Sequence, residues 1–470
     1  MSRIVNALNI ARYPKESKNQ FVFNVLLGMA YLLFLIAVKD TAVQQSFING
    51  WFDYYIMFRM DSETDTQKAT QDITYLDFDN KSFQVLGKPD ITPRDKIADL
   101  LNIAYRSNAQ IVILDFDFSE KDYTPEKIFS GDETAKSGAE RDQALFKLIE
   151  RIKNDSESQT KILLPITTYA DKSIKHNVFS ELIDDKKVFA VTPTLTTNRS
   201  GDNYARFWLP YLEAKDAETN EQKILWSIPL LSSVLYKGNV DDLEALKAEI
   251  LSSDKSVFVT EITREHKEQF KFYREMTADG GLIRDTSALQ YNRIQYTAIP
   301  PDVLPQYPFG TISPSNIGHW RKDGLDNKRI DCQNKIVIIG RTDEDCADFF
   351  LTPIGNLTGM YIHGNSIASI LGATRPHLTP LYKHVLIEIF LILVAAYSFL
   401  ILSEFKAKCL TFALTPLCWI LSYGWFCLSN EFVYLVFAFT FVGAYNLVSD
   451  VQFLIVNGLL LRRMLRRRVH

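Results

Sequence analysis

The distribution of apolar residues divides the chain into apolar ends and a polar middle. One apolar run, 21–38, lies near the N-terminus, and three more, 384–402, 410–428 and 432–456, lie near the C-terminus. Because a helix rises ~1.5 Å per residue and a bilayer core is ~30 Å thick, each run is long enough to cross a membrane or nearly so. The pattern predicts one N-terminal and three C-terminal transmembrane helices around a single domain, 39–381.

Basic residues next to these runs predict how the chain is oriented. They occur in segment 1–20 before the first run, in the loop 403–408, and in the basic tail 457–470. Basic segments beside membrane helices stay in the cytoplasm. We therefore expect both termini to be cytoplasmic, the first run to be an uncleaved anchor, and the domain 39–381 to lie outside the cytoplasm.

Within the middle domain, short apolar runs alternate with helical patterns. The runs Ile73–Phe78 and Ile111–Phe116 predict strands, and between them Thr92 is a helix N-cap candidate, followed by Pro93 and an amphipathic pattern. Strand, helix and strand in this order predict two parallel strands. Glu120–Gly138 is polar and predicts a surface loop. Further elements are predicted at Arg141–Ile152, Lys161–Ile166, Val188–Val191, Trp226–Tyr236, Arg293–Tyr296, Lys335–Gly340 and Ile362–Leu371.

The predicted fold class is an α/β extracytoplasmic domain with a partly parallel sheet, plus four transmembrane α-helices. The formal net charge of −4 shows no basic excess, which argues against nucleic-acid binding. The seven histidines show no metal-ligand spacing, and no phosphate loop or nucleophile elbow occurs. We expect no metal, no cofactor and no enzymatic activity. Cys332 and Cys346 would be permitted to form a disulfide outside the cytoplasm, and the sequence leaves their pairing open.

Two pairs of aspartates are the main candidates for a functional site in the domain. Asp77 and Asp79 end the first predicted strand, and Asp115 and Asp117 end the second. Carboxyl ends of parallel strands are where α/β folds bind ligands, and four converging carboxylates would suit a hard cation. The alternative is structural, in which they cap the following helices and pair with Arg94. The first pair is similar to the strand-end motif of phosphoaspartyl hydrolases, but the residues after it do not follow that pattern.

The order of motifs resembles the second type of CHASE domain, an extracytoplasmic sensing module associated with bacterial cyclases and histidine kinases. The resemblance begins with ITYLDFDNKSFQVLGKPDITPR at Ile73–Arg94 and IVILDFDFSE at Ile111–Glu120. It closes with KIVIIG, then Asp348 before FLTP, and then GMYIHGN at Gly359–Asn365. The sequence departs from the family pattern around Asp90–Thr92 and at Gly364, where the family has alanine between the histidine and the asparagine.

The resemblance implies a sensor in the bacterial inner membrane, with its large domain periplasmic or extracellular. It adds Asp348, His363 and Asn365 as ligand-binding or structural candidates. Family members commonly continue into an output domain, whereas this sequence stops after a basic tail. We therefore expect membrane lipid and a separate membrane or cytoplasmic output protein as partners. The docking candidates are Asn446, Asp450, Arg462, Arg463, Arg466, Arg467 and Arg468.

The expected function is a membrane-bound sensor or accessory subunit, whose outer domain recognises a ligand or an envelope protein. A structural or assembly component of a membrane complex is the alternative, and an exported hydrolase ranks third. The sequence leaves the ligand and any homo-oligomeric state open.

Overall fold

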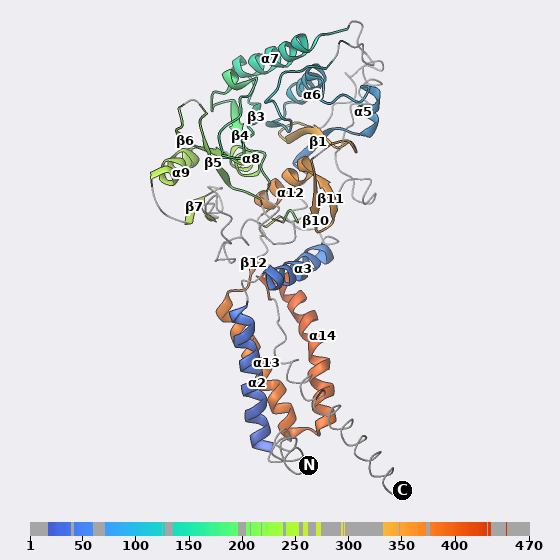
Figure 1. Ribbon diagram of the computed structural model, residues 1–470, viewed down its shortest axis with the longest axis vertical. Helices are drawn as coiled ribbons and strands as arrows, with labels where there is room; N and C mark the ends of the chain where they lie inside the picture. Colours follow the sequence, from blue (N-terminus) through green and yellow to red (C-terminus); the bar gives the residue numbers. More distant parts are fainter. Residues whose placement is uncertain are drawn as a thin grey trace, which may run out of the picture. The chain divides into compact units, whose positions relative to one another are not determined.

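The structure is a computed structural model of the 470-residue chain (Figure 1). Two compact units are present, one formed by Met1–Tyr55 with Pro376–His470 and the other by Ile56–Arg375. The second unit, which we call the α/β unit, falls within the predicted domain 39–381. The structure describes residues 17–38, 42–59, 71–124, 126, 135–195, 204–206, 208–217, 219–237, 241–252, 257–261, 269–273, 293–294, 296, 332–346, 348–372, 377–429, 431–433 and 448.

A five-stranded sheet forms the centre of the α/β unit (Figure 1). The strand order is β1-β9-β2-β3-β4, and every neighbouring pair is parallel. The predicted strands β1 and β2 are therefore parallel but not adjacent, because β9 lies between them. The strands are β1 Ile73–Phe78, β2 Ile111–Leu114, β3 Lys161–Pro165, β4 Val188–Val191 and β9 Ile336–Arg341.

Helices cover both faces of this sheet. The helices α6 (Arg94–Arg106) and α7 (Gly138–Asn154) pack on one face, while α8 (Ile228–Lys237) and α12 (Gly359–Leu371) pack on the other. Successive strand residues point to opposite faces of a sheet. In β9, Ile338 lies in the core beside α8 and α12, and Ile339 lies in the core beside α6 and α7. Burial of both faces explains why the strands are continuous apolar runs.

The start of α6 differs from the prediction, which assigned the capping role to Thr92. The helix begins at Arg94, and Pro93 holds the N-cap position without a side-chain hydrogen bond. The capping carboxylate comes from Asp122, whose Oδ2 accepts a hydrogen bond from the backbone N of Arg94 at 3.1 Å. Asp122 is buried. The first part of the segment expected to be a surface loop, Glu120–Gly138, is therefore packed against α6.

Smaller elements complete the α/β unit. The run predicted at Trp226–Tyr236 divides into the end of one strand and the helix α8. Of the run Arg293–Tyr296, the described residues Ile294 and Tyr296 are buried in the core beside α8 and α12. The smaller elements are α5 Asn80–Val85, η1 Ser180–Leu182, α9 Asp241–Ser252, and the antiparallel hairpins of β5 Tyr211–Lys215 with β6 Gln222–Trp226, β7 Val257–Glu261 with β8 Gln269–Tyr273, and β10 Phe349–Thr352 with β11 Gly355–Thr358.

The other unit, which we call the helical unit, is built from long helices. Leu32 packs with Ile392 in its core, and a β-carbon at Gly28 would lie 2.7 Å from the Ile392 Cγ2 atom. Gly28 therefore permits α2 and α13 to approach closely. The elements are α2 Ser17–Ala37, α3 Ala42–Arg59, α13 Leu381–Ile401 and α14 Glu404–Ser429, with the short strands β12 His377–Leu378 and β13 Glu431–Phe432.

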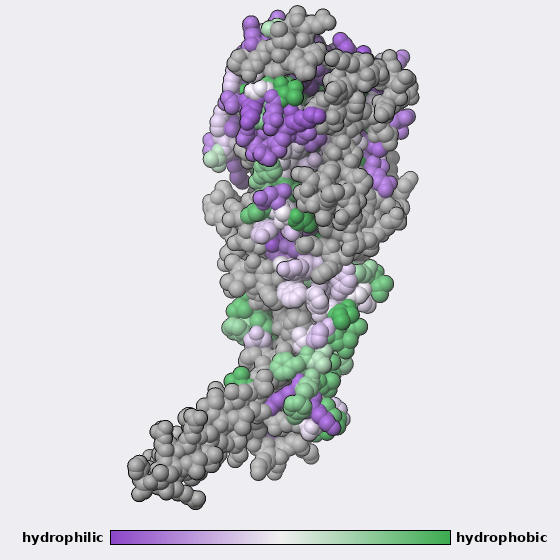
Figure 2. All heavy atoms as spheres, turned by 90° about the vertical axis from the view of Figure 1, so that its right-hand side faces the viewer, coloured by the Kyte–Doolittle hydropathy of each residue, from purple (hydrophilic) through white to green (hydrophobic). Residues whose placement is uncertain are grey.

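Two helices of this unit are long and apolar enough to cross a membrane, over Leu381–Ile401 and Phe405–Ser429, and a shorter apolar helix covers Phe21–Ala37. Large apolar side chains such as Leu386 and Phe390 are more than half exposed on them, and Figure 2 shows apolar residues gathered along these helices. Extended exposed apolar surface is typical of lipid contact. The predicted fourth run, 432–456, lies almost wholly outside the described residues, so four spans remain a prediction.

Aromatic side chains gather where α3 meets the end of α14. The ring centroids of Trp51 and Trp419 are 5.5 Å apart, and those of Phe52 and Phe432 are 4.7 Å apart. Tyr55 donates a hydrogen bond to the carbonyl of Trp419 at 3.2 Å. Belts of Trp and Tyr are typical of the boundary between membrane and water. The N-terminal part of α3 therefore belongs with the helical unit.

Candidate functional site

The candidate site lies at the carboxyl ends of the parallel strands, beside β9. After β9 the chain leads to α12 on one face of the sheet, and after the adjacent β2 it leads to α7 on the opposite face. Where the connections of neighbouring parallel strands leave in opposite directions, a crevice opens between them, and α/β proteins bind ligands there.

A cavity of about 460 Å³ occupies this crevice. Its volume is in the range of pockets that hold small organic molecules. The segment Asp90–Thr92, where the sequence departs from the family pattern, forms part of the wall. The polar lining is Asp90, Thr92, Arg94, Asp115, Asp117, Thr167, Thr194, Arg341, Cys346, Asp348 and His363, and the apolar lining is Ile91, Phe116, Pro165, Pro193, Leu195 and Phe350.

Two carboxylates in the cavity interact electrostatically. Asp115 follows β2 directly, and its backbone N donates to the carbonyl of Ile339 at 2.7 Å, which holds it at the strand end. Burial and the nearby charge of Asp348 raise the pKa of Asp115 well above its usual range. Burial also raises the pKa of Asp348 to about 6, although the residue is exposed at the cavity mouth and solvent weakens the effect. The pair therefore binds a proton more readily than ordinary aspartates do.

Asp348 is held in place by the start of α12. The N-cap residue of this helix, Thr358, makes no side-chain hydrogen bond. Instead, the backbone N of Gly359 donates to Asp348 Oδ2 at 3.1 Å and to the Asp348 carbonyl at 3.0 Å. A β-carbon at Gly359 would lie 2.0 Å from Asp348 Oδ2. The glycine therefore makes room for the carboxylate.

His363 lies one turn into α12 and is 2% exposed. It donates a hydrogen bond to the carbonyl of Pro193, whereas its Nδ1 atom has no hydrogen-bond partner among the described residues. The proton is therefore on Nε2, and Nδ1 is a free acceptor. Burial lowers the pKa of His363 to about 4, so the ring is neutral at physiological pH.

Arg94 is the main buried cation of the site. Its Nη2 donates to the carbonyls of Asp117 at 3.1 Å and Glu120 at 3.4 Å, and its Nε lies 3.8 Å from Asp142 Oδ1. The guanidinium also lies 4.6 Å from the ring centroid of Phe118. Arg94 thus binds the loop after β2 through main-chain carbonyls. Of the strand-end carboxylates predicted to pair with Arg94, Asp117 interacts electrostatically with the guanidinium, whereas the ion pair at 3.8 Å is with Asp142 of α7.

Arg341, at the end of β9, was not among the predicted site residues. Its Nε and Nη2 each donate to a different carboxylate oxygen of Asp343 at 2.8 Å, and its Nη1 donates to the carbonyl of Asp90 at 3.2 Å. The hydrogen bonds to Asp343 raise the pKa of Arg341. The sequence signal that could have identified it is the spacing of Arg341 and Asp343, two positions apart at the end of a buried strand.

The four predicted carboxylates do not converge. Asp77 is buried and accepts a hydrogen bond from Thr342 Oγ1 at 2.9 Å, so it fixes the loop after β9. Asp79 caps α5 by accepting from the backbone N of Ser82 at 2.8 Å. Neither lines the cavity, because β9 separates their strand from β2. Asp79 thus caps the following helix, as the structural alternative expected, whereas Asp77 binds the loop after β9.

Of the other predicted residues, Asp117 lines the cavity and Asn365 does not. Asp117 is exposed, and its Oδ1 accepts from the backbone N of Ser119 at 2.9 Å. Asn365 is buried, and its Nδ2 donates to the carbonyl of Tyr361 at 2.8 Å within α12. The partner-docking candidates, Asn446, Asp450, Arg462, Arg463, Arg466, Arg467 and Arg468, lie outside the described residues.

The cysteines and the possible metal ligands of the α/β unit bear on what the cavity can bind. Cys332 and Cys346 are both free thiols. Cys332 is buried in the core beside α6 and α7, whereas Cys346 lines the cavity. No group of His, Cys, Asp and Glu side chains in the described part of the chain is arranged to hold a metal ion. The lining combines several hydrogen-bond acceptors with apolar side chains.

The comparisons with known proteins identify one family for the chain. No curated protein and no solved structure matches the chain. The model of the CHASE2 domain family matches residues 28–400, which is most of the chain and includes every residue that lines the cavity. CHASE2 is an extracytoplasmic sensing domain. The chain therefore belongs to the CHASE2 family.

Proposed function

We propose that this protein is a non-catalytic membrane sensor that binds a small molecule in the cavity beside β9 and transmits binding through its membrane helices. The cavity carries the proposal, because it combines the ligand-binding position of α/β folds with an apolar wall and a buried acceptor, His363 Nδ1, that has no hydrogen-bond partner among the described residues. Membership of a family of extracytoplasmic sensing domains supports it.

The proposed place of the protein is the bacterial inner membrane, with the α/β unit outside the cytoplasm and both termini inside. Supporting this are the basic flanks of the apolar runs, the two apolar helices α13 and α14, and the aromatic cluster around Trp51 and Trp419.

The helix α12 offers a route from the cavity to the membrane segment. Its first turns carry Gly359, which binds Asp348, and His363, which lines the cavity. Only residues 372–380 separate the end of α12 from the start of α13 in sequence. A ligand that binds one position of α12 better than another shifts the population of the two states. That shift is the proposed signal.

The output is proposed to reside in a partner that contacts the C-terminal segment. Asn446 and Asp450 are one helical turn apart in the sequence, and five arginines follow between Arg462 and Arg468. This polar and basic face would dock the partner at the cytoplasmic surface of the membrane, where anionic lipid also attracts it.

Alkylation of Cys346 tests the cavity as a ligand site. The full chain in lipid nanodiscs is treated with iodoacetamide in the presence of a panel of small amines, alcohols and carboxylic acids, and each cysteine peptide is quantified by mass spectrometry. We expect at least one chemical class to protect Cys346. Cys332, which is fully buried, reports any unfolding, and alkylation of a denatured sample reports the activity of the reagent. Unprotected Cys346 across the whole panel would contradict the proposal.

A further inference from the structure

The cavity lining carries more acidic than basic side chains. Four aspartates and two arginines form its charged lining. Each arginine forms an ion pair with a carboxylate outside the cavity, Arg94 with Asp142 and Arg341 with Asp343, and Arg94 also interacts electrostatically with Asp117. Neither Asp115 nor Asp348 has an ion pair with a cationic side chain among the described residues. Among the described residues, Asp115 and Asp348 are therefore a part of the wall whose negative charge has no matching cation.

The two carboxylates that lack a cation are also close enough to affect each other. The charge of Asp348 disfavours ionisation of Asp115, and burial disfavours ionisation of both. A cation between them removes this cost, because it stabilises both ionised carboxylates. The two carboxylates alone would accept any cation, whereas a third group of the same cavity is more selective.

That third group is His363. It is 2% exposed, it lines the same cavity, and its Nδ1 atom has no partner among the described residues. A buried acceptor without a partner costs free energy, which a ligand that donates a hydrogen bond recovers. Because the bond to Pro193 uses the Nε2 proton, His363 can only accept at Nδ1. The missing group must therefore be a donor.

The rest of the wall is apolar. Phe116 and Phe350 contribute aromatic rings, and Pro165, Pro193 and Leu195 contribute aliphatic surface. A bare metal ion would leave this surface and most of the 460 Å³ unused. The ligand must combine a compact donor group with an apolar body.

We propose that the cavity binds a small organic amine, in its protonated primary or secondary form, attached to an apolar body. This inference rests on the proposed sensing function and adds the ligand class. The ammonium N–H groups donate to the carboxylates of Asp115 and Asp348 and to Nδ1 of His363. The apolar body packs against Phe116 and Phe350, where an aromatic ring fits best. A quaternary ammonium satisfies the charge but has no donor for His363.

The test compares matched probes in the Cys346 alkylation assay on the full chain in nanodiscs at neutral pH. Phenethylamine carries the ammonium group, phenylethanol is its neutral counterpart, phenylpropionate is anionic, and trimethylphenethylammonium lacks the N–H donors. We expect phenethylamine to protect Cys346 at a concentration at least tenfold lower than any other probe, which corresponds to about 1.4 kcal/mol. Cys332 must remain unreactive throughout.

Variants then assign the effect to the carboxylate pair. Asp348→Asn keeps an acceptor for Gly359 and removes the charge, so we expect it to raise the half-protecting concentration of phenethylamine about tenfold. The matched control is Glu344→Gln, which makes the same chemical change on an exposed residue of the same loop that does not line the cavity. It should leave protection unchanged.

The possible outcomes distinguish failure of the proposed ligand class from failure of the proposed sensing function. Equal protection by phenethylamine and phenylethanol, or an unchanged phenethylamine response in Asp348→Asn, would overturn the amine class. If phenylpropionate protects Cys346 and phenethylamine does not, the cavity still binds ligands and only the class is wrong. If no probe protects Cys346, the amine class and the cavity-based sensing function both fail.

Discussion

The hydroxyl of Tyr75 occupies the place that a side chain at Gly364 would need. A β-carbon at residue 364 would lie 1.8 Å from Tyr75 Oη and 2.6 Å from its Cζ atom. Tyr75 is 1% exposed in the middle of β1, and Gly364 is buried in the second turn of α12, next to His363. The glycine within GMYIHGN, one of the departures from the family pattern, is therefore explained by the tyrosine that packs across from it.

The close contact between Tyr75 and Gly364 predicts that adding one methyl group at residue 364 lowers the stability of the protein. Gly364→Ala should destabilise the protein by about 1–3 kcal/mol, because the β-carbon overlaps a rigid ring in a packed core. The measurement is the thermal or denaturant unfolding of the full chain. Gly50→Ala is the matched control, since a β-carbon there meets nothing within 4 Å, and it should be neutral or slightly stabilising.

A double-mutant cycle identifies Tyr75 as the cause. Tyr75→Leu removes the ring and has its own cost as a large-to-small core change. In that background Gly364→Ala should cost at least about 1 kcal/mol less than in the wild type. Additive costs would show that the strain at residue 364 arises elsewhere.

The raised pKa of Asp348 predicts how stability depends on pH. A carboxyl group whose pKa is raised on folding stabilises the fold while it is protonated, and this contribution is lost as pH rises from about 4 through about 6. Asp348→Asn cannot ionise, so its stability relative to wild type should increase over this window. Because solvent reaches Asp348, we expect a gain of only about 1 kcal/mol at neutral pH. Unfolding curves of both proteins at each pH measure it.

Asp348→Ala separates the charge from the hydrogen bond. It removes the acceptor for the backbone N of Gly359, but that N–H also donates to the main-chain carbonyl of residue 348. The loss should therefore be near the lower end of the ~1–3 kcal/mol expected for an unpaired donor. A large loss in Asp348→Ala together with a gain in Asp348→Asn would show that the side chain mainly orders the start of α12.

Arg94 should not tolerate replacement by lysine. The guanidinium makes two main-chain hydrogen bonds and stacks on Phe118, and a lysine ammonium cannot reproduce this planar geometry. We expect Arg94→Lys to lower the free energy of unfolding by about 1–3 kcal/mol. Arg106→Lys, at the exposed end of the same helix, is the control and should change stability by less than about 0.5 kcal/mol. Similar behaviour of the two variants would contradict a structural role for Arg94.

Local patterns in the sequence predicted the elements well because they depend on near neighbours. The strands β1 and β3 and the helix α12 follow from apolar runs and helical spacing, and their predicted limits differ from the observed ones by a few residues at most. The amphipathic pattern after Pro93 likewise located α6, although its cap is Asp122, a residue from a distant loop. A cap supplied through tertiary contact leaves no local sequence signal.

The candidate site could be predicted only in part, because it depends on strand order. The strand β9 is more than 200 residues from β2 in sequence, yet it pairs with both β1 and β2. Its insertion separates Asp77 from Asp115, which the sequence alone placed at one sheet edge. The Asp115, Asp348 and His363 candidates all line one cavity, and their role as site residues stays a prediction. The role of Arg341 depended on knowing that β9 is central.

The last prediction concerns the side of the membrane on which the C-terminal tail lies. The strands β12 and β13 pair in parallel, and Lys383 Nζ lies 2.8 Å from Glu431 Oε1. The chain before α13 and the chain after α14 therefore meet at the same end of the helical unit. If α13 and α14 cross the membrane as a pair, Glu431 is on the same side as the start of α13. A cytoplasmic tail then requires one further crossing by the run 432–456.

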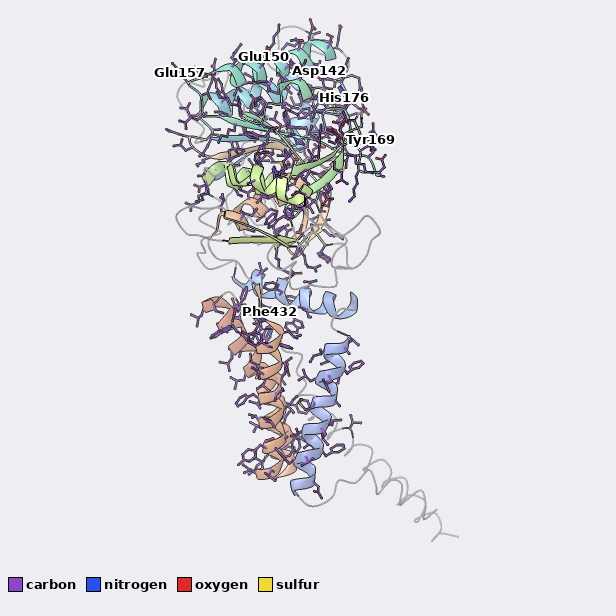
Figure 3. All side chains as sticks on the ribbon, turned by 90° about the vertical axis from the view of Figure 1, so that its left-hand side faces the viewer. Asp142, Glu150, Glu157, Tyr169, His176 and Phe432 are labelled. Atoms are coloured by element: carbon purple, nitrogen blue, oxygen red, sulfur yellow. The ribbon has the colours of Figure 1, made fainter. Side chains whose placement is uncertain are left out.

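Cysteines introduced for labelling with a membrane-impermeant maleimide test this arrangement. Glu150, an exposed residue of α7 labelled in Figure 3, should react in intact spheroplasts when changed to cysteine. Cysteines at Lys406, in the first turn of α14, and at Val469, in the basic tail, should react only after permeabilisation. Peptide-level quantification separates them from the native cysteines. A protected Lys406 site with an accessible Val469 site would show that 432–456 does not cross, and the docking face would then lie outside the cytoplasm.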